Sequence, residues 1–558
     1  MTDKLSFFIS KFEELIRRPA EPGRFFTPRA YRNAAVRFRA NASHNCDKAK
    51  NLLGTSACPL HSVKARTELV AHIGLNPFFY PAHLLPGCDL LSDSGTTTMT
   101  IEQWSQLLLG DEAYGSNEGY YQLNEQFGIT FGEAWRQDLN HRTQTLFIFH
   151  QGRAAEHALF STLARHLALE KISPLRTLLK NHPDPTGLFA RVDTTIARLE
   201  HKAKANRRPE PYYLIPSNGH FDTTAANIED SNFVALNLNC PEHKKNDENF
   251  PFRGNINLEE LKILLNTLPN RIPLVYLTIT NNTGGGQPVS MANIRAAHSL
   301  TAGHHIPLFF DACRFAENAW FIRARESGYE NKTISEIVRE MFQYVDGFHI
   351  SLKKDGLGNI GGALLIRPDG LFARRYPEVL EKLTDYQILV EGHPTYGGLA
   401  GRDLKTLVEG LRTVVTPEYL ESRIGQVRRF ADRLSGDGIP VLKPAGGHAV
   451  YIDIDRFFPD ARDEDYPGIA FVALLLIAGY RLCELGVYAF ELEGTTPPRN
   501  NFVRAAIPRL TYEDQDLFAT AEAIKLLYEH RDSIPGVEVV FGKELSLRHF
   551  KSRFQFKN

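Results

Sequence analysis

The fold is decided by residues 274–311, LVYLTITNNTGGGQPVSMANIRAAHSLTAGHHIPLFFD. Residues 274–280 are rich in β-branched and apolar side chains and predict a buried strand. Ser290 predicts the N-cap of a helix over 290–303, and residues 306–310 predict the next strand. A strand, a helix and a second strand in this order indicate parallel pairing, with helices covering the faces of the sheet.

The same alternation extends on both sides of this stretch. Short apolar runs predict further strands at 145–149, 213–215, 233–236, 348–351 and 362–366. Thr333 and Glu336 form a capping-box pattern, which predicts the start of another helix. The predicted fold class is therefore α/β, with a large domain built on a mainly parallel sheet.

Changes in this rhythm predict the domain boundaries of the 558-residue chain. We expect an irregular N-terminal extension at 1–60, part of a small domain at 61–90, the large domain at 91–400 and a small α+β domain at 401–558. A locally basic stretch at about 170–210 interrupts the alternation and predicts a solvated helical insertion. A surface that binds a partner or an acidic ligand is the alternative for this stretch.

Composition excludes several classes of protein. Lysine and arginine (64) nearly balance aspartate and glutamate (65), so the chain lacks the basic field that attracts nucleic acid or an anionic membrane. The six cysteines form no CxxC pair, which argues against a structural zinc site. The longest apolar run, residues 469–478, is far short of the ~20 residues that span a bilayer. We expect a cytoplasmic protein without nucleic-acid or membrane partners.

Polar residues follow several of the predicted strands. Asp311 directly follows 306–310, Lys354 closely follows 348–351, and Gln151 to Arg153 open the helix after 145–149. Ligands of open parallel sheets bind at the carboxyl ends of strands. A lysine amine can bind the aldehyde of pyridoxal phosphate, an aspartate can keep its ring nitrogen protonated, and a helix N-terminus can bind its phosphate. The pattern predicts a pyridoxal-phosphate site.

A glycine motif nearby suggests a different cofactor. Gly356, Gly358 and Gly361 match the GxGxxG pattern of dinucleotide-binding proteins. That reading requires a helix directly after the glycines, but residues 362–366 predict a strand. We interpret the motif as a glycine-rich turn beside Lys354.

The motifs together resemble a known family. They occur in the order DSGTTTMTIEQWSQLLLGDEAYGS, FHQGRAAEHAL, HFDTT, NTGGGQPVSMANIRA, FFDACRFAENAWFI, SLKKDGLGNIGG, EGHPTYGGLAGRD, GGHAVYIDID and LRHF. These segments resemble the tryptophanase and tyrosine phenol-lyase family, the β-eliminating lyases of pyridoxal-phosphate fold type I. The resemblance runs from about residue 91 to the C-terminus and leaves out residues 1–60 and the basic insertion.

The resemblance implies cofactor roles for matched positions. In it, Lys354 binds the coenzyme and acts as a base, Asp311 pairs with the ring nitrogen, and Phe221 stacks on the ring. The implied cofactor-binding set is Lys354, Asp311, Arg314, Asn282, Gln151, Gly152, Arg153, Phe221 and Ser351. Arg314 and Asn282 would contact the ring hydroxyl, and Gln151, Gly152 and Arg153 would cradle the phosphate.

The resemblance also implies substrate and cation roles. Ser94 and Arg504 would hold the substrate carboxylate, and Tyr114 would protonate the leaving aromatic carbon. A monovalent cation, usually potassium, would bind at Gly95, Glu112 and Asn359. Family members are tetramers, so a homotetramer built as a dimer of dimers is implied, with an amino acid as the small-molecule partner.

The substrate pocket favours one branch of the family. Phenol-lyases carry an arginine where this chain has Leu485, and Asp222 and His549 also resemble tryptophanase. We therefore expect L-tryptophan to be converted to indole, pyruvate and ammonia. His393 replaces an apolar residue usual in both branches, and AGRD and NIGG resemble phenol-lyase. Tyrosine phenol-lyase, another β-substituted amino-acid lyase, and an idle homologue that acts as an interaction protein are the alternatives.

Overall fold

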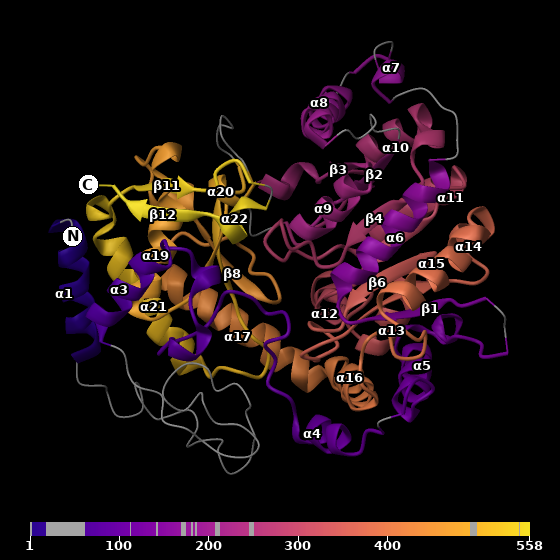
Figure 1. The fold of residues 1–558 in the computed structure, drawn as a ribbon, viewed down its shortest axis with the longest axis horizontal. Coiled ribbons are helices and arrows are strands. Elements are labelled where there is room, and N and C mark those ends of the chain that lie inside the picture. The colour runs from indigo at the N-terminus through magenta and orange to yellow at the C-terminus, as the bar shows by residue number, and fades with distance from the viewer. Residues whose placement is uncertain are drawn as a thin grey trace. The chain divides into compact units, whose positions relative to one another are not determined.

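The computed structural model describes residues 3–17, 62–111, 113–140, 143–168, 175–179, 182–184, 187–206, 213–244, 250–490, 499–545 and 547–557 (Figure 1). The chain divides into two compact units. Unit 1 comprises Met1–Thr100, Lys244–Glu248 and Ser422–Asn558, and unit 2 comprises Ile101–His243 and Asn249–Glu421. The domain boundaries expected from the sequence stay predictions.

Unit 2 is built on a seven-stranded sheet with the order β1-β7-β6-β5-β4-β2-β3. The strands are β1 (Leu146–Phe149), β2 (Leu214–Ser217), β3 (Val234–Asn237), β4 (Val275–Thr278), β5 (Leu308–Asp311), β6 (Gly347–Ser351) and β7 (Gly362–Ile366). Strands β6, β5, β4, β2 and β3 each pair in parallel with the next strand in this order. Strand β7 is antiparallel to both β6 and β1. The mainly parallel sheet is confirmed. Strand β7 departs from it because a turn rather than a crossover helix joins it to β6.

Helices cover both faces of this sheet, as the buried strands require. One face carries α6 (Gly152–Leu167), α9 (Asp222–Asp230) and α15 (Pro377–Val390). The other carries α5 (Glu118–Phe131), α12 (Phe315–Arg325) and α13 (Ile334–Gln343). On that second face the ring of Phe131 lies 4.5 Å from Phe342 and 4.9 Å from Phe348 of β6. Alternate residues of β6 therefore face opposite helix layers.

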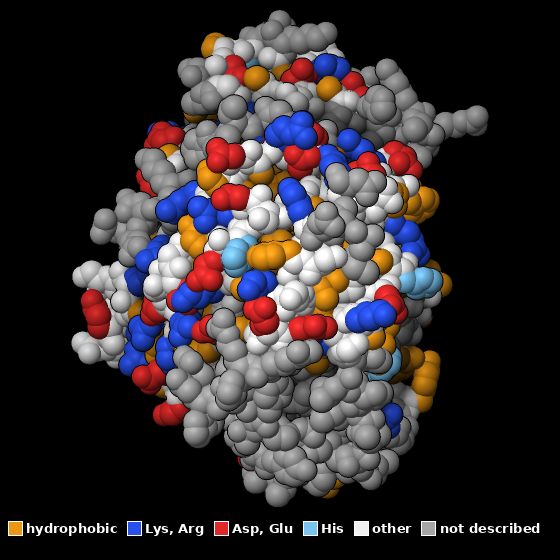
Figure 2. All heavy atoms as spheres, turned by 90° about the vertical axis from the view of Figure 1, so that its left-hand side faces the viewer, with side chains coloured by type: hydrophobic (Ala, Val, Ile, Leu, Met, Phe, Trp, Pro, Cys, Tyr) orange, Lys and Arg blue, Asp and Glu red, His pale blue; other side chains and the backbone are white. Residues whose placement is uncertain are grey.

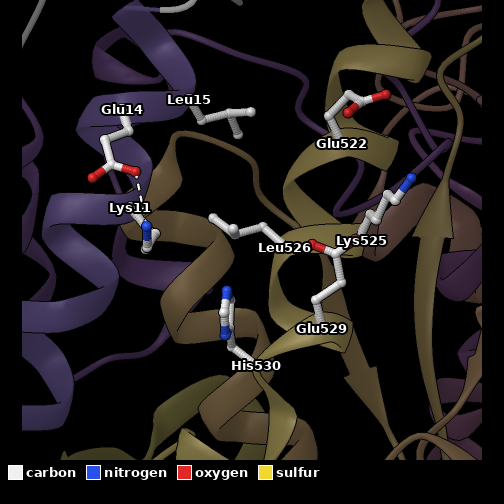
Figure 3. Close-up of a pocket in the computed structure, with 8 residues that line it drawn as sticks. All are labelled: Lys11, Glu14, Leu15, Glu522, Lys525, Leu526, Glu529 and His530. Atoms are coloured by element: carbon white, nitrogen blue, oxygen red, sulfur yellow. Dashed lines mark hydrogen bonds and ion pairs between the residues drawn. The ribbon is translucent and has the colours of Figure 1, made fainter.

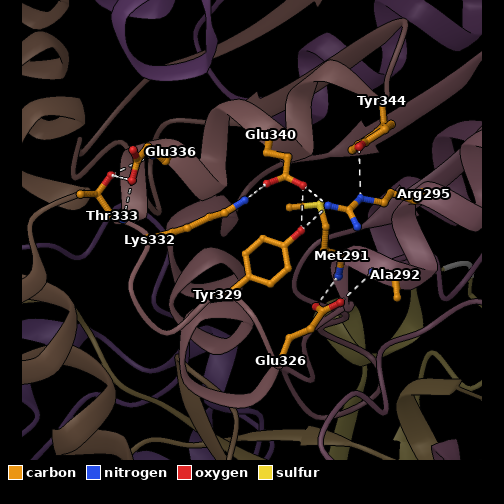
Figure 4. A network of polar contacts seen from close by, with 10 residues as sticks. All are labelled: Met291, Ala292, Arg295, Glu326, Tyr329, Lys332, Thr333, Glu336, Glu340 and Tyr344. Atoms are coloured by element: carbon orange, nitrogen blue, oxygen red, sulfur yellow. Dashed lines mark hydrogen bonds and ion pairs between the residues drawn. The ribbon is translucent and has the colours of Figure 1, made fainter.

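The predicted caps of α11 (Met291–Gly303) and α13 are confirmed. The Ser290 hydroxyl accepts a hydrogen bond from the Asn293 amide at 3.1 Å. Thr333 accepts from the Glu336 amide at 3.2 Å, and the Glu336 carboxylate accepts from the Thr333 amide at 2.7 Å. Figure 4 shows this capping box beside the ion pairs around Glu340, which link α13 to α11. Local cap chemistry fixes both helix starts.

The capping box leads to a stability prediction. Replacing Thr333 with alanine should lower the free energy of unfolding by about 1 kcal/mol, because an amide in the first turn of α13 loses its partner. Urea unfolding of the purified protein measures the change. Thr333→Ser keeps the hydroxyl and should stay close to the wild type. An unaltered unfolding midpoint for Thr333→Ala would contradict the role of the cap.

The remaining helices of unit 2 include those of the predicted insertion. They are α4 (Ile101–Leu108), α7 (Leu175–Leu179), α8 (Leu188–Asn206), α10 (Leu258–Thr267), α14 (Leu371–Arg375) and α16 (Gly401–Val414). Most of the described part of 170–210 is helical, in α7 and α8. Helix α8 packs against the edge strand β3 and buries Leu188, Val192 and Ile196, which are spaced four residues apart.

Unit 1 contains two small antiparallel sheets and a helical core. The elements are α1 (Asp3–Arg17), α3 (Val63–His72), β8 (Ala449–Asp453), α18 (Ile454–Phe457), α19 (Pro467–Ala478), β9 (Cys483–Leu485), α20 (Val487–Phe490), β10 (Phe502–Ala506), α21 (Asp514–Glu529), β11 (Val537–Phe541), α22 (Arg548–Lys551) and β12 (Arg553–Phe556). The sheet orders are β8-β10-β9 and β11-β12. Helix α17 (Pro417–Gly436) begins in unit 2 and continues into unit 1.

Two segments of unit 1 answer expectations from the sequence. The irregular structure expected at the N-terminus is wrong for residues 3–17, which form α1 because Leu5, Phe8 and Phe12 bury one apolar face. The rest of 1–60 lies outside the described residues. The apolar run at 469–478 is the buried helix α19, packed against α3 and α21. Among the described residues, no helix combines the length and apolar character needed to cross a bilayer.

One face of unit 1 carries mixed charges. In Figure 2, lysine and arginine side chains are interspersed with aspartate and glutamate over the described atoms. A polar pocket between α1 and α21 shows the same mixture: Lys11 pairs with Glu14 at 2.9 Å, opposite Glu522 and Lys525 (Figure 3). This pocket contains none of the site residues predicted from the sequence. The candidate site lies elsewhere.

Candidate active site

The predicted cofactor residues of unit 2 gather at the carboxyl ends of its parallel strands. Asp311 is the last residue of β5 and only 5% exposed, and it pairs in register with Thr278 of β4 and His349 of β6. The Ile279 amide donates to the Asp311 carbonyl at 3.0 Å, and the Arg314 amide donates to the Ile279 carbonyl at 3.2 Å. The chain segments that lead into Asn282 and Arg314, both buried, therefore run side by side next to Asp311.

Lys354 lies in the turn that follows β6. Its amide donates to the Ser351 carbonyl at 3.2 Å, and the Ser351 amide donates to the Cys313 Sγ atom at 3.2 Å. The next residue, Asp355, accepts from the Ala316 amide at 2.9 Å in the first turn of α12. These bonds hold the lysine turn against the segment that follows Asp311, because both segments start from neighbouring strands.

The charges of this site keep Asp311 ionised. Burial by itself would raise the pKa of the Asp311 carboxyl, but the positive charges of His349 and Lys354 outweigh burial and lower that pKa below its ordinary value. Lys354 and Asp311 thus interact electrostatically within one site, as a coenzyme held between an amine and a carboxylate requires. An ionised carboxylate at this position suits the protonated nitrogen of a pyridine ring.

The start of α6 has the features of an anion-binding cradle. Gln151 is the N-cap of this sixteen-residue helix, and Gly152 approaches Ser351 so closely that a Cβ atom on Gly152 would lie 2.6 Å from the Ser351 Cβ. The pKa of Lys353 is lowered first by burial and then by the positive charges of Lys354 and Arg153. These three cationic side chains therefore lie close to this helix start. First-turn amides, the helix dipole and positive charge fit a phosphate group.

The half-buried residue Phe221 completes the cofactor set as the N-cap of α9, and the Asn227 side chain of that helix donates to the Arg153 carbonyl at 3.4 Å. Asp222 lies in the first turn of α9, where its Oδ1 accepts from the Thr223 amide at 2.6 Å. The structure therefore places α9 beside the start of α6.

The glycine motif does not precede a helix. Strand β7 follows Gly361 directly, which confirms the strand predicted after the glycines; the dinucleotide motif requires a helix there. The glycines instead allow α16 to approach: a Cβ on Gly358 would lie 2.4 Å from a Leu407 methyl, and one on Gly410 would lie 1.9 Å from the Gly356 carbonyl. The glycines of the motif therefore let α16 pack closely against the turn after Lys354.

Tyr114 and His393 lie together in unit 2. Their rings are 6.0 Å apart, and the Tyr396 ring lies 5.6 Å from Tyr114. His393 Nδ1 contacts the Thr395 hydroxyl at 2.8 Å, and that hydroxyl also accepts from the Ser116 amide at 2.6 Å. The hydrogen bond with Tyr396 raises the pKa of Tyr114 above its ordinary value. Tyr114 is 81% exposed in the single chain.

The predicted substrate-carboxylate residues lie in unit 1. Arg504 of β10 is buried, and its Nη2 donates to the Leu91 carbonyl at 3.2 Å. A buried ion pair of 2.9 Å between Arg509 and Asp93 holds the same segment, in which Ser94 follows. The segment that carries Ser94 is thereby held beside the strand that carries Arg504.

The predicted side-chain pocket residues also lie in unit 1. Leu485 of β9 belongs to a buried apolar cluster with Tyr451 and Phe502. His549 of α22 lies near Glu484, whose pKa burial raises to about 7, although amides of α20 and the charge of His549 oppose that rise. Leu485 and Glu484 are consecutive strand residues, so their side chains face opposite sides of the sheet.

The predicted cation ligands divide between the units. Gly95 belongs to unit 1 and Asn359 to unit 2, and Glu112 lies outside the described residues. Their common role stays a prediction.

Sequence reasoning missed three polar residues of the site. His349 and Glu156 form a buried pair behind Asp311, and Tyr396 is bonded to Tyr114. A signal existed for the first two, because His349 lies in the middle of the buried strand GFHIS and Glu156 lies on the buried side of α6. Polar side chains in such positions need buried partners.

Comparison with known proteins agrees with the resemblance seen in the sequence motifs. The profile of the family described as beta-eliminating lyase matches residues 89–172 and 191–522. A tryptophanase of Salinibacter ruber is 39% identical over 84% of this chain and 87% of the relative, and one of Hyphomonas neptunium is 38% identical over 84% and 90%. A tyrosine phenol-lyase of Fusobacterium nucleatum is 35% identical over 88% and 94%. The break in the profile match falls inside the stretch predicted as an insertion.

A solved structure supports the architecture. The aspartate aminotransferase of Thermotoga maritima matches 85% of this chain and 98% of its own with a TM-score of 0.50. At 12% identity this likeness concerns the fold alone.

Proposed function

Because the chain belongs to the β-eliminating lyase family of pyridoxal-phosphate enzymes, we propose that it cleaves L-tryptophan to indole, pyruvate and ammonia. Membership confirms the predicted family, fold class, lyase activity by β-elimination and cofactor. The substrate, the residue roles, the cation, the assembly and the compartment are proposals. The observation that carries the choice of substrate is Leu485 in an apolar cluster, at the position where phenol-lyases have an arginine.

The residues of the site fit the cofactor. Lys354, Asp311 and the cradle at the start of α6 offer an amine, an ionised carboxylate and an anion site. Bound pyridoxal phosphate would supply an electron sink for the negative charge that develops at the substrate Cα. Gln151, Gly152, Arg153 and Ser351 would hold its phosphate, and Phe221, Asn282 and Arg314 would contact its ring.

The remaining residues would bind the substrate and move protons. Ser94 and Arg504 hold its carboxylate, and the Lys354 amine takes the α-proton. Tyr114 donates its phenolic proton to the ring carbon that leaves. By the resemblance, Asp222, His549 and Leu485 would belong to the side-chain pocket; His393 lies beside Tyr114.

We also propose K⁺ at Gly95, Glu112 and Asn359, a cytoplasmic location and a homotetramer. Leu389 (84% exposed) and Val390 (58%) at the end of α15 are apolar surface that a second copy could cover. Replacing K⁺ with Na⁺ in the assay tests the cation, and sedimentation tests the assembly.

A substrate panel tests the proposed activity. The purified enzyme with coenzyme and K⁺ is given tryptophan, tyrosine and other β-substituted amino acids, and pyruvate and the released ring are measured. Indole and equal pyruvate from tryptophan support the proposal. Phenol release from tyrosine as the faster reaction would favour the phenol-lyase alternative, which the similarity to a tyrosine phenol-lyase also supports. Bound coenzyme without pyruvate from any amino acid would indicate an idle homologue.

Leu485→Arg should change the substrate preference. Placing a guanidinium in the cluster around Tyr451 and Phe502 should lower kcat/KM for tryptophan at least about tenfold relative to that for tyrosine. Steady-state kinetics with both amino acids measures the ratio. Leu485→Met conserves the volume and should keep the wild-type ratio. An equal loss for both substrates would mean that Leu485 only supports the fold.

A further inference from the structure

A buried histidine lies behind the Asp311 carboxylate. His349 of β6 is fully buried, and its Nε2 atom lies 3.0 Å from the Glu156 Oε1 atom and 3.5 Å from the Asp311 Oδ1 atom. On the other side of the ring, Nδ1 contacts the Tyr276 hydroxyl. Both ring nitrogens therefore have polar partners, and Nε2 faces two carboxylates.

Glu156 is itself held in place from α9. Its Oε1 accepts from the Thr224 hydroxyl at 2.8 Å, and its Oε2 accepts from the Asn227 side chain at 3.0 Å. These two bonds hold the Glu156 carboxylate in place beside the imidazole. Glu156 and Asp311 thus place two negative charges beside one buried imidazole.

A cation between the two carboxylates balances this charge. Burial opposes a charge on the imidazole, but Asp311 and Glu156 together raise the pKa of His349 well above its ordinary value. Without that cation the two buried carboxylates would repel each other, and one of them would take up a proton.

The same cluster has donors that a metal ion could use. Ligand atoms of Asp311, Cys313 and His349 lie within 4.8 Å of one another. However, His349 Nε2 faces Glu156, its Nδ1 faces Tyr276, and Cys313 Sγ accepts from the Ser351 amide. These atoms are used in hydrogen bonds, which favours a protonated histidine over a metal.

We propose that His349 is a positioning residue whose charge keeps Asp311 ionised, so that the proton between this carboxylate and bound pyridoxal phosphate stays on the ring nitrogen. The inference rests on the proposed function, because it needs the coenzyme to lie over Asp311. Losing the charge moves the proton towards the carboxylate, since each unit change in pKa moves the equilibrium about tenfold.

The test reads the protonation of the coenzyme directly. His349→Gln keeps an N–H donor and removes the charge. The holoenzyme is loaded with pyridoxal phosphate labelled with ¹⁵N in its ring, and its nitrogen resonance is recorded at neutral pH. The wild type should give the signal of a protonated pyridine. In His349→Gln the signal should move towards the unprotonated value, with the ratio of protonated to unprotonated ring nitrogen about tenfold lower. An unmoved resonance would overturn the proposal.

A double variant separates charge from mere support of the fold. His349→Gln/Glu156→Gln removes both charges of the pair and should recover part of the protonated signal that the single variant lost. A purely structural role predicts a larger loss in the double variant, which would overturn the proposal. His298→Gln, which alters a histidine bonded to the Tyr344 carbonyl at 2.8 Å, should match the wild type.

Two measurements on the wild-type protein complete the test. With ¹⁵N-labelled histidine, His349 should show both ring nitrogens protonated at neutral pH, and a neutral imidazole would overturn the proposal even if the variants do not fold. Stoichiometric metal in the purified protein would also overturn it. Absence of the absorbance of lysine-bound coenzyme in the wild type would instead refute the proposed function, which keeps the two failures distinct.

Discussion

Lys354→Ala is expected to remove the visible absorbance of the lysine-bound coenzyme and to lower tryptophan turnover about 10³-fold or more. The covalent attachment needs the amine of this side chain, and the proposed proton transfer at the substrate Cα uses the same nitrogen. Absorption spectra of the loaded protein and pyruvate release measure the two effects.

The neighbouring lysine provides the matched control. Lys353 lies one residue away, and both burial and nearby positive charge lower its pKa. Lys353→Ala should therefore keep the coenzyme absorbance that Lys354→Ala loses. If Lys353→Ala abolished the absorbance and Lys354→Ala preserved it, the assignment of the two lysines would be wrong.

Asp311→Asn should give the second large effect, a loss of about 10²–10³-fold in turnover with the coenzyme still bound. An amide cannot balance the positive charge of a protonated ring nitrogen, so the ring becomes a weaker electron sink. Asp311 lies among His349, Cys313 and Lys354, which are arranged around a carboxylate. Steady-state kinetics and coenzyme titration separate turnover from binding.

The conservative variant tests this explanation. Asp311→Glu keeps the charge with a longer side chain and should retain more activity than Asp311→Asn. The ring ¹⁵N resonance should be that of an unprotonated nitrogen in Asp311→Asn and of a largely protonated nitrogen in Asp311→Glu. Wild-type turnover in Asp311→Asn would show that the carboxylate does not hold the ring nitrogen.

Part of the fold could be predicted because it depends on residues close in sequence. The strand predicted at 362–366 has the same bounds as β7, and the caps at Ser290 and Thr333 form as predicted. Hydrophobic periodicity and cap chemistry act within about one helical turn or one short strand. The direction of β7 could not be predicted in this way, because it depends on which strands pair.

The candidate site likewise has a part that could be predicted from the sequence and a part that could not. Lys354 and Asp311 could be brought together from the sequence, because they follow consecutive parallel strands whose ends meet at one edge of the sheet. The pairs Glu156–His349 and Tyr114–Tyr396 join residues more than a hundred positions apart, on elements whose approach depends on packing. Their roles stay predictions, as do those of Ser94, Arg504 and the cation ligands.

The sequence by itself determined the strand and helix alternation, the family motifs and the presence of an amine, a carboxylate and a helix start at neighbouring strand ends, because these are local patterns. Only the tertiary structure decided the charge environment of Asp311. That environment depends on α6, which covers the face of the sheet that bears the His349 side chain and carries Glu156. The protonation state of a buried group depends on the partners that folding places around it.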